Sequence, residues 1–149
     1  MPCGRSAKPI LFMLGQIGRM RHHCVREMVG PLGLFRGQQC VLLAIAESEG
    51  ATQSELAAAI PIRPATMTHA LQRLERAGFI ERRNDPDDQR ISRVYLSEKG
   101  RRILCPLRQT VDALHERALQ GFTPEETRTL RGYLERICDN LSEQRDDKE

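Results

Sequence analysis

The chain has 149 residues, of which 40% are hydrophobic, and this size fits one domain with its own core rather than several domains. The longest apolar run near the N-terminus covers only residues 10–14, so the sequence predicts neither a membrane helix nor a secretory signal. Five cysteines, an odd number without a Cys-x-x-Cys pair, are typical of reduced thiols in a cytoplasmic protein.

Charged residues are distributed unevenly along the chain. The net charge is only +3, but residues 61–102 carry ten Lys or Arg against six Asp or Glu, whereas residues 103–149 carry seven against ten. A basic middle and an acidic end are expected if the middle faces phosphates and the end does not. A solvated charged surface explains the same asymmetry, so this pattern alone leaves both interpretations open.

Two helices are predicted in the N-terminal third. The first runs from about Pro9 to Met28, because apolar side chains recur there on one stripe of a helix. That stripe consists of Met13, Ile17, Met20, Cys24 and Met28. Gly30-Pro31 ends this helix, and a second, mostly buried helix covers roughly residues 37–47.

A pair of short helices follows. Thr52 and Glu55 have the spacing of a capping box, which predicts that a helix begins there. Pro64 suits the first turn of the next helix, which runs to about Ala77, and Gly78 supplies the left-handed residue after it. The inner face of that second helix carries Met67, Leu71 and Leu74, and the outer face carries Thr66, His69, Gln72, Arg73 and Arg76.

Two short helices joined by a tight turn are typical of a helix-turn-helix, whose second helix enters the major groove of DNA. Thr, His, Gln and Arg can all read hydrogen-bond donors and acceptors on base edges. An ordinary amphipathic helix also has a polar outer face, so the helix pair alone does not decide between the two interpretations.

A basic β-hairpin is predicted directly after the helix pair. Residues 79–83 and 91–96 have strand-like patterns, and residues 84–90 form a polar tip from which Arg90 projects into solvent or a partner. A two-stranded ribbon is marginally stable alone, so this one must pack against helices. This arrangement is typical of a DNA-binding wing and favours the helix-turn-helix interpretation.

Residues 37–100 resemble the MarR family of winged helix-turn-helix regulators. The stretches that match in order and spacing are 53–57, 66–68, 71–80, 82–83, 85–90 and 94–100. The Asp-Pro-x-Asp-x-Arg sequence of the tip is distinctive. His69 stands where the family often has Arg and Gln72 where it often has Asp, which leaves the operator sequence open.

The resemblance implies a mainly α fold with a small β-wing, in a single domain of residues 1–149. A DNA-binding lobe at residues 37–100 would lie between dimerisation helices at 1–30 and 103–145. Two amphipathic helices in the C-terminal third agree with this arrangement, although Pro106 predicts a bend in the first of them. Their apolar seams are Leu104, Leu107, Val111, Leu114 and Ala118, then, after a Thr123 cap, Leu130, Leu134, Ile137 and Leu141.

The resemblance also implies roles for individual residues. Arg90 corresponds to a wing arginine that reaches the narrow minor groove. Asp88, together with Asp85, is expected to shape the wing by pairing with an arginine such as Arg73 or Arg93, although a simple turn also explains these acids. The residues expected to contact double-stranded DNA are Arg63, Thr66, Thr68, His69, Gln72, Arg73, Arg82, Arg83, Arg90 and Arg93. A homodimer would read a pseudo-palindromic operator with half-sites about 10 bp apart.

Three sensing chemistries remain open around the first helix. Relatives often have a pocket for a small anionic aromatic effector, which Arg19, His22 and His23 would line here. Cys24 is a candidate for thiol oxidation, since neighbouring Arg or His side chains lower a thiol pKa. A metal or haem site at residues 22–24 is disfavoured because adjacent helix residues diverge by about 100°. No cofactor or metal is therefore expected.

Enzymatic function is not expected. The sequence contains no Gly-rich phosphate loop, zincin motif or Gly-x-Ser-x-Gly. The hypothesis is a DNA-binding transcriptional regulator, most simply a repressor released by a small-molecule or redox signal. The alternative is a winged-helix module that contacts only other proteins, against which the basic wing argues.

Overall fold

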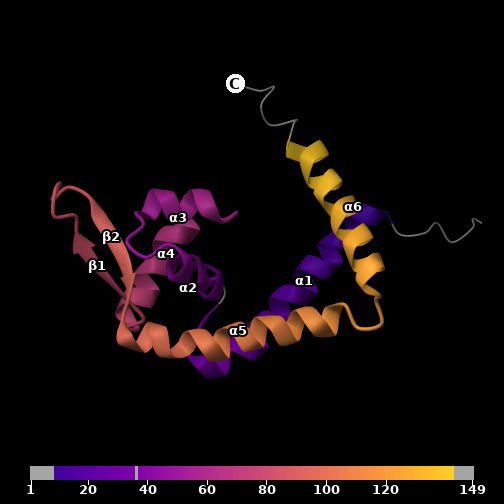
Figure 1. The fold of residues 1–149 in the computed structure, drawn as a ribbon, viewed down its shortest axis with the longest axis horizontal. Coiled ribbons are helices and arrows are strands. Elements are labelled where there is room, and N and C mark those ends of the chain that lie inside the picture. Colours follow the sequence, from indigo (N-terminus) through magenta and orange to yellow (C-terminus); the bar gives the residue numbers. More distant parts are fainter. Residues whose placement is uncertain (1–8, 36, 143–149) are drawn as a thin grey trace, which may run out of the picture. The chain divides into compact units, whose positions relative to one another are not determined.

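The computed structural model describes residues 9–35 and 37–142 and has the expected mainly α fold with a small antiparallel sheet (Figure 1). The elements are α1 (Ile10–Val29), the 3-10 helix η1 (Gly30–Leu32), α2 (Gln38–Glu47), α3 (Gln53–Ala59), α4 (Pro64–Arg76), β1 (Ile80–Asn84), β2 (Ser92–Leu96), α5 (Glu98–Ala118) and α6 (Pro124–Ser142). The chain divides into two compact units, and the boundary falls between Asp112 and Ala113, inside α5.

The core of the first unit lies among α2, α4 and the hairpin. Its fully buried large side chains are Leu34, Leu42, Ile45, Leu56, Met67, Leu71, Leu74, Leu107, Val29, Val41 and Val94. Val29 and Leu107 lie outside residues 37–100, so the lobe extends at both ends beyond its expected limits. Placing Leu107 in a seam for a partner chain is wrong, because its side chain has no exposed surface left to offer.

Local signals set the limits of α3 and α4. The Thr52 hydroxyl accepts the Glu55 N–H (3.3 Å) and the Glu55 carboxylate accepts the Thr52 N–H (2.7 Å), so the predicted capping box is confirmed. The helix α4 begins at Pro64 and ends before Gly78, which has a φ of 76°. There the Phe79 N–H donates to the Leu74 carbonyl, as in a Schellman motif, and this contact turns the chain into β1.

Both edges of β2 are hydrogen bonded. One edge pairs with β1 in the register Ile80↔Leu96 to Asn84↔Ser92. On the other edge, the Val94 carbonyl accepts the Gly50 N–H (2.8 Å) and the Val94 N–H donates to the Ala51 carbonyl (3.0 Å). The connection between α2 and α3 thus supports the hairpin, which a two-stranded ribbon needs in order to be stable.

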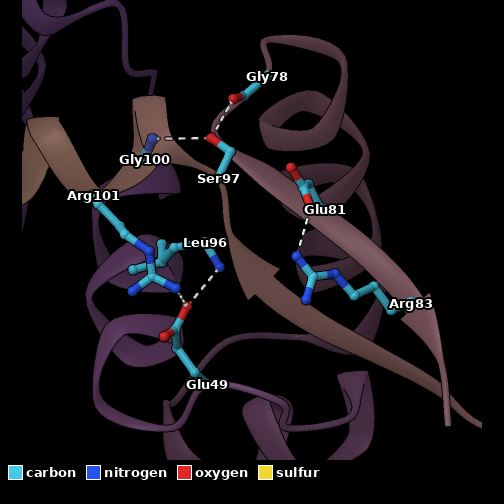
Figure 2. Close-up of polar contacts among 8 residues, drawn as sticks. All are labelled: Glu49, Gly78, Glu81, Arg83, Leu96, Ser97, Gly100 and Arg101. Atoms are coloured by element: carbon cyan, nitrogen blue, oxygen red, sulfur yellow. Dashed lines mark hydrogen bonds and ion pairs between the residues drawn. The ribbon is translucent and has the colours of Figure 1, made fainter. Parts of the chain in front are cut away.

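Polar contacts fix the start of α5 to the base of the hairpin (Figure 2). The Ser97 hydroxyl donates to the Gly78 carbonyl (2.6 Å) and accepts the Gly100 N–H (3.0 Å). Glu49 Oε1 accepts both the Leu96 N–H (3.0 Å) and the Arg101 guanidinium (2.8 Å). The orientation of the hairpin and the direction of α5 are therefore set together.

Helix α6 and the end of α5 form the second unit. The predicted Thr123 cap is confirmed, because its hydroxyl accepts the Glu126 N–H (3.1 Å) and its own N–H donates to the Glu126 carboxylate (2.8 Å). Helix α5 continues through Pro106. The apolar side chains of Tyr133 and Leu141 are both 56% exposed. Within the part of the chain that the structure describes, no helix is long and apolar enough to cross a membrane.

Candidate nucleic-acid interface

The outer face of α4 presents polar side chains to solvent. Met67, Leu71 and Leu74 are fully buried on the inner face, so the 3.6-residue period places Thr66, His69 and Gln72 on the opposite side. All three of these side chains are exposed, as the sequence predicted. A hydroxyl, an imidazole and a carboxamide can each donate and accept hydrogen bonds, which is the chemistry needed to read base edges.

Thr68 differs from those three, because its hydroxyl is already engaged inside the protein. It accepts a hydrogen bond from Gln53 Nε2 (2.7 Å) and donates one to the Pro64 carbonyl (3.1 Å). The hydroxyl therefore ties the first turns of α4 to α3. Thr68 was expected to contact DNA, but the single hydrogen-bond donor of its hydroxyl is already used within the protein.

Arg82 extends the same network from β1. Its guanidinium lies 3.4 Å from the Glu75 carboxylate and 3.4 Å from Gln53 Oε1. Gln53 thus connects α3, α4 and β1 through its one carboxamide. Sequence reasoning missed Gln53 as part of this region, because its partners lie 15 and 29 residues away along the chain.

Arg83 lies on the exposed side of the hairpin, where its guanidinium is 3.0 Å from the Glu81 carboxylate (Figure 2). The guanidinium also stacks over the Tyr95 ring, 4.8 Å from its centroid, on the neighbouring strand. Its side chain remains 62% exposed, so these contacts hold the guanidinium in place without removing it from solvent.

The tip of the hairpin is organised by Asp85. Its Oδ1 accepts the N–H groups of Asp87 (2.8 Å) and Asp88 (3.2 Å), while Oδ2 accepts a hydrogen bond from the Arg93 guanidinium. The Arg93 bond, reinforced by the Asp87 N–H, lowers the pKa of Asp85 below its ordinary value. Arg93 also donates to the Gly50 carbonyl (2.8 Å) and so belongs to the framework of the wing.

The expected arginine pairing of Asp88 is wrong. Its carboxylate instead accepts the Arg90 N–H (3.0 Å), two residues further along the turn. Asp85, the second candidate, forms the ion pair because its side chain points back toward β2, whereas Asp88 is exposed within the turn itself. Arg73, the other suggested partner, lies in the last turn of α4.

Arg90 is exposed at the tip, and within the described residues its side chain forms no ion pair. Arg63, directly before α4, is exposed as well. The structure thus places these two cations where a partner can reach them. Arg82 and Arg93, which were also expected to contact DNA, instead form ion pairs and hydrogen bonds within the protein.

The expected sensing residues lie on α1. Arg19, His22 and His23 are exposed and Cys24 is half-buried. Nδ1 of His23 lies 3.4 Å from the Arg26 guanidinium one turn later. Across residues 9–35 and 37–142, no three His, Cys, Asp or Glu side chains are placed to hold a metal ion.

Comparisons with known proteins agree with this geometry. The family model described as "MarR family" matches residues 36–92. The HTH-type transcriptional regulator YybA of Bacillus subtilis is 33% identical over 132 residues, which cover 89% of this chain and 88% of YybA.

Solved structures are similar over almost the whole chain. The transcriptional regulator SlyA superposes with a TM-score of 0.85 at 32% identity, covering 92% of this chain and 96% of SlyA. A cysteine variant of MarR from E. coli, complexed with operator DNA, has a TM-score of 0.79 at 26% identity and covers 87% of this chain and 94% of that one.

Proposed function

Because this chain belongs to the MarR family of transcriptional regulators, we propose that it is a repressor that binds a pseudo-palindromic operator as a homodimer. The observation that carries this proposal is the pairing of two exposed elements in one rigid lobe. The outer face of α4 offers base-reading side chains, and Arg90, which has no ion-pair partner among residues 9–35 and 37–142, lies at the tip of a wing supported by the connection between α2 and α3.

The two elements suit different grooves. Thr66, His69 and Gln72 lie in the first three turns of α4, where a recognition helix meets base edges in the major groove. Arg90 would enter the adjacent minor groove, whose negative potential attracts a guanidinium. Arg63 and Arg83 would contact phosphates, which contribute affinity without sequence information.

Homodimer formation is supported by apolar surface that residues 9–35 and 37–142 leave exposed. On α1, Ile10, Leu11, Ile17 and Met20 are 66%, 60%, 56% and 66% exposed. Tyr133 and Leu141 on α6 are similarly exposed. Monomeric proteins rarely expose so many large apolar side chains on neighbouring turns of one helix, so a second copy is the simplest cover for them.

Release of the operator would follow from a change near α1. A shift of a few ångströms between the two recognition helices would place one of them out of register with its half-site. An anionic small molecule near Arg19, His22 and His23 is the first candidate signal, oxidation of Cys24 the second, and metal or haem the third. A release assay with salicylate-like acids, peroxide, zinc and haemin separates them, with Cys24→Ser as the control for oxidation.

A selection on randomised duplex DNA tests the function itself. The expected products contain two inverted half-sites with centres about one helical turn, ~10 bp, apart. Titration of a selected duplex should show affinity that falls steeply with salt, since phosphate contacts release counterions. A protein-contact module would bind no duplex above the background of non-specific sequences, and this result would overturn the proposal.

A further inference from the structure

A chain of hydrogen bonds runs from β1 through α3 to the first turns of α4. The Arg82 guanidinium donates to Gln53 Oε1 (3.4 Å), and Gln53 Nε2 donates to the Thr68 hydroxyl (2.7 Å). That hydroxyl donates in turn to the carbonyl of Pro64, the first residue of α4 (3.1 Å). Gln53 is the first residue of α3, so three elements of the lobe meet at its one carboxamide.

The chemistry of each group fixes the direction of these hydrogen bonds. A guanidinium can only donate, so the atom of Gln53 that faces Arg82 must be the oxygen. The one hydrogen of the Thr68 hydroxyl goes to the Pro64 carbonyl, so the hydroxyl oxygen accepts from the Gln53 amide. A carboxamide donates and accepts at once and therefore suits both partners. An apolar side chain of similar size would fill the same space and make neither bond.

The two ends of this chain of bonds lie in the two candidate DNA-reading elements. Pro64 and Thr68 belong to the first turns of α4, where the side chain of Thr66 is exposed. Arg82 is the middle residue of β1, the strand that leads to the tip with Arg90. The carboxamide of Gln53 thus connects the base-reading turns with the wing.

Other contacts hold the hairpin at different points. Val94 of β2 is hydrogen bonded to the connection between α2 and α3, and Ser97 is hydrogen bonded to Gly78 at the base of the hairpin. Arg82 also lies 3.4 Å from Glu75, near the end of α4. None of these three contacts reaches the first turns of α4, which Gln53 does reach.

A polar residue at the start of a helix often serves only the free backbone N–H groups of that helix. In α3, Thr52 and Glu55 already form the cap. The two partners of the Gln53 side chain lie 15 and 29 residues away along the chain. A role confined to the start of α3 therefore does not account for them.

We propose that Gln53 is a positioning residue that sets the distance and angle between the base-reading turns of α4 and the wing. It acts through Thr68 and Arg82, so that one lobe reads the major groove and the adjacent minor groove in a single register. The inference rests on the proposed function, because a register has meaning only if both elements bind DNA.

The test compares two DNA duplexes. The first is a selected operator. The second carries one extra base pair in each half-site, between the positions whose preference depends on Gln72 and those whose preference depends on Arg90. The insertion moves the two segments apart by about 3.4 Å along the helix axis. Wild type should bind the second duplex about tenfold or more weakly, a cost comparable with that of a mismatched base pair.

Two substitutions of Gln53 separate hydrogen bonding from size. Gln53→Met keeps the length of the side chain but makes neither bond, so the ratio of the two dissociation constants should fall toward unity. Gln53→Glu should restore the wild-type ratio, because a carboxylate accepts from Arg82 and from a Thr68 hydroxyl that turns away from Pro64. Its negative charge weakens binding to both duplexes alike and cancels in the ratio.

Gln120→Met is the matched control, since it makes the same replacement at an exposed residue after α5. This variant should keep the wild-type ratio. Thermal melting should change little in Gln53→Met, because Gln53, Thr68 and Arg82 are all half-buried and water can replace the lost partner. A change in the ratio is then an effect on position rather than on folding.

Residual dipolar couplings of the free protein give a readout without DNA. In wild type and Gln53→Glu, the backbone N–H vectors of α4 and of the hairpin should fit one alignment tensor. In Gln53→Met, the hairpin should show smaller couplings than the tensor of α4 requires, because the two elements then move separately.

Three results would overturn the proposal. The first is a wild-type ratio of dissociation constants in Gln53→Met, and the second is a single alignment tensor for α4 and the hairpin in that variant. The third is a ratio in Gln53→Glu as low as in Gln53→Met, which would contradict the role of the hydrogen bonds. Failure of the repressor proposal looks different: wild type itself would prefer no duplex, and the register would fail with it before any variant is compared.

Discussion

Asp85 and Arg93 form an ion pair that joins the tip of the wing to its second strand. The same carboxylate accepts two backbone N–H groups of the turn, and the same guanidinium donates to the Gly50 carbonyl before α3. One side-chain pair therefore connects the turn, β2 and the helix-turn-helix. Removing either partner should alter the position of Arg90 relative to α4 without touching Arg90 itself.

Asp85→Asn is expected to lower the stability of the protein at neutral pH. The folded-state pKa of Asp85 is depressed by Arg93, so its contribution is present above the ordinary carboxyl pKa and is lost as the pH falls through the folded value. The difference in urea midpoint between wild type and variant should therefore shrink below about pH 4. Asp87→Asn, whose side chain is exposed in the same turn, is the control. A pH-independent difference would contradict the role of the ion pair.

Arg90→Ala is expected to weaken operator binding without changing the melting temperature, because the side chain is exposed. The loss should be about 1–3 kcal/mol for each half-site, as for other good groove contacts. Titration of a labelled duplex measures it. Arg108→Ala removes the same charge from α5 and should leave affinity almost unchanged. Equal losses in both variants would indicate a general charge effect instead of a groove contact.

Gln72→Ala should change which base is preferred at one position of each half-site, since its exposed carboxamide is free to read a base edge. Thr68→Val should behave differently. This substitution preserves the shape of the side chain but breaks both hydrogen bonds of the hydroxyl, to Gln53 and to Pro64. It should therefore weaken binding to all DNA sequences alike. Selection from randomised half-sites with each variant distinguishes the two. A single-position change in Thr68→Val would mean that Thr68 reads bases after all.

Met20→Glu should dissociate the dimer, because a carboxylate would replace a side chain that is 66% exposed on the apolar face of α1. Sedimentation of the wild type at micromolar concentration should give twice the chain mass of 17.0 kDa, and the variant should give the chain mass. Leu107→Ala should instead lower the free energy of unfolding by about 2–5 kcal/mol, because Leu107 is a core residue of one chain. A monomeric wild type would refute the assembly.

Gly100→Ala should destabilise the first unit. An added Cβ would lie 2.1 Å from the Phe79 carbonyl oxygen, a backbone atom that is itself held by the Ser97 N–H (3.0 Å). This overlap is expected to lower the free energy of unfolding, measured by urea titration, by about 1–3 kcal/mol or more. Gly132→Ala in α6 is the matched control, since its Cβ would meet nothing within 4 Å and alanine favours a helix. Similar stability of the two variants would show that the junction in Figure 2 is not tightly packed.

Local chemistry was readable from the chain alone. The Thr52 and Thr123 capping boxes, Pro64 at a helix start and Gly78 after a helix end all act within a few residues, so their spacing in the sequence determines the structure they form. The division of α4 into a buried and an exposed face follows equally from its helical period. These features are sufficient to identify a helix-turn-helix with a wing and to find Arg90 at its tip.

Tertiary structure decided which partner each side chain takes. A helical period shows that Leu107 needs cover, but only packing shows that its own lobe, and not a second chain, provides it. The turn sequence presents several carboxylates, and the fold brings only Asp85 to Arg93. Gln53 contacts Thr68 and Arg82 across 15 and 29 residues, and so engages two side chains that the sequence assigned to DNA contact. Such pairs depend on how elements pack in space, whereas sequence periodicity records only which face of each element is apolar.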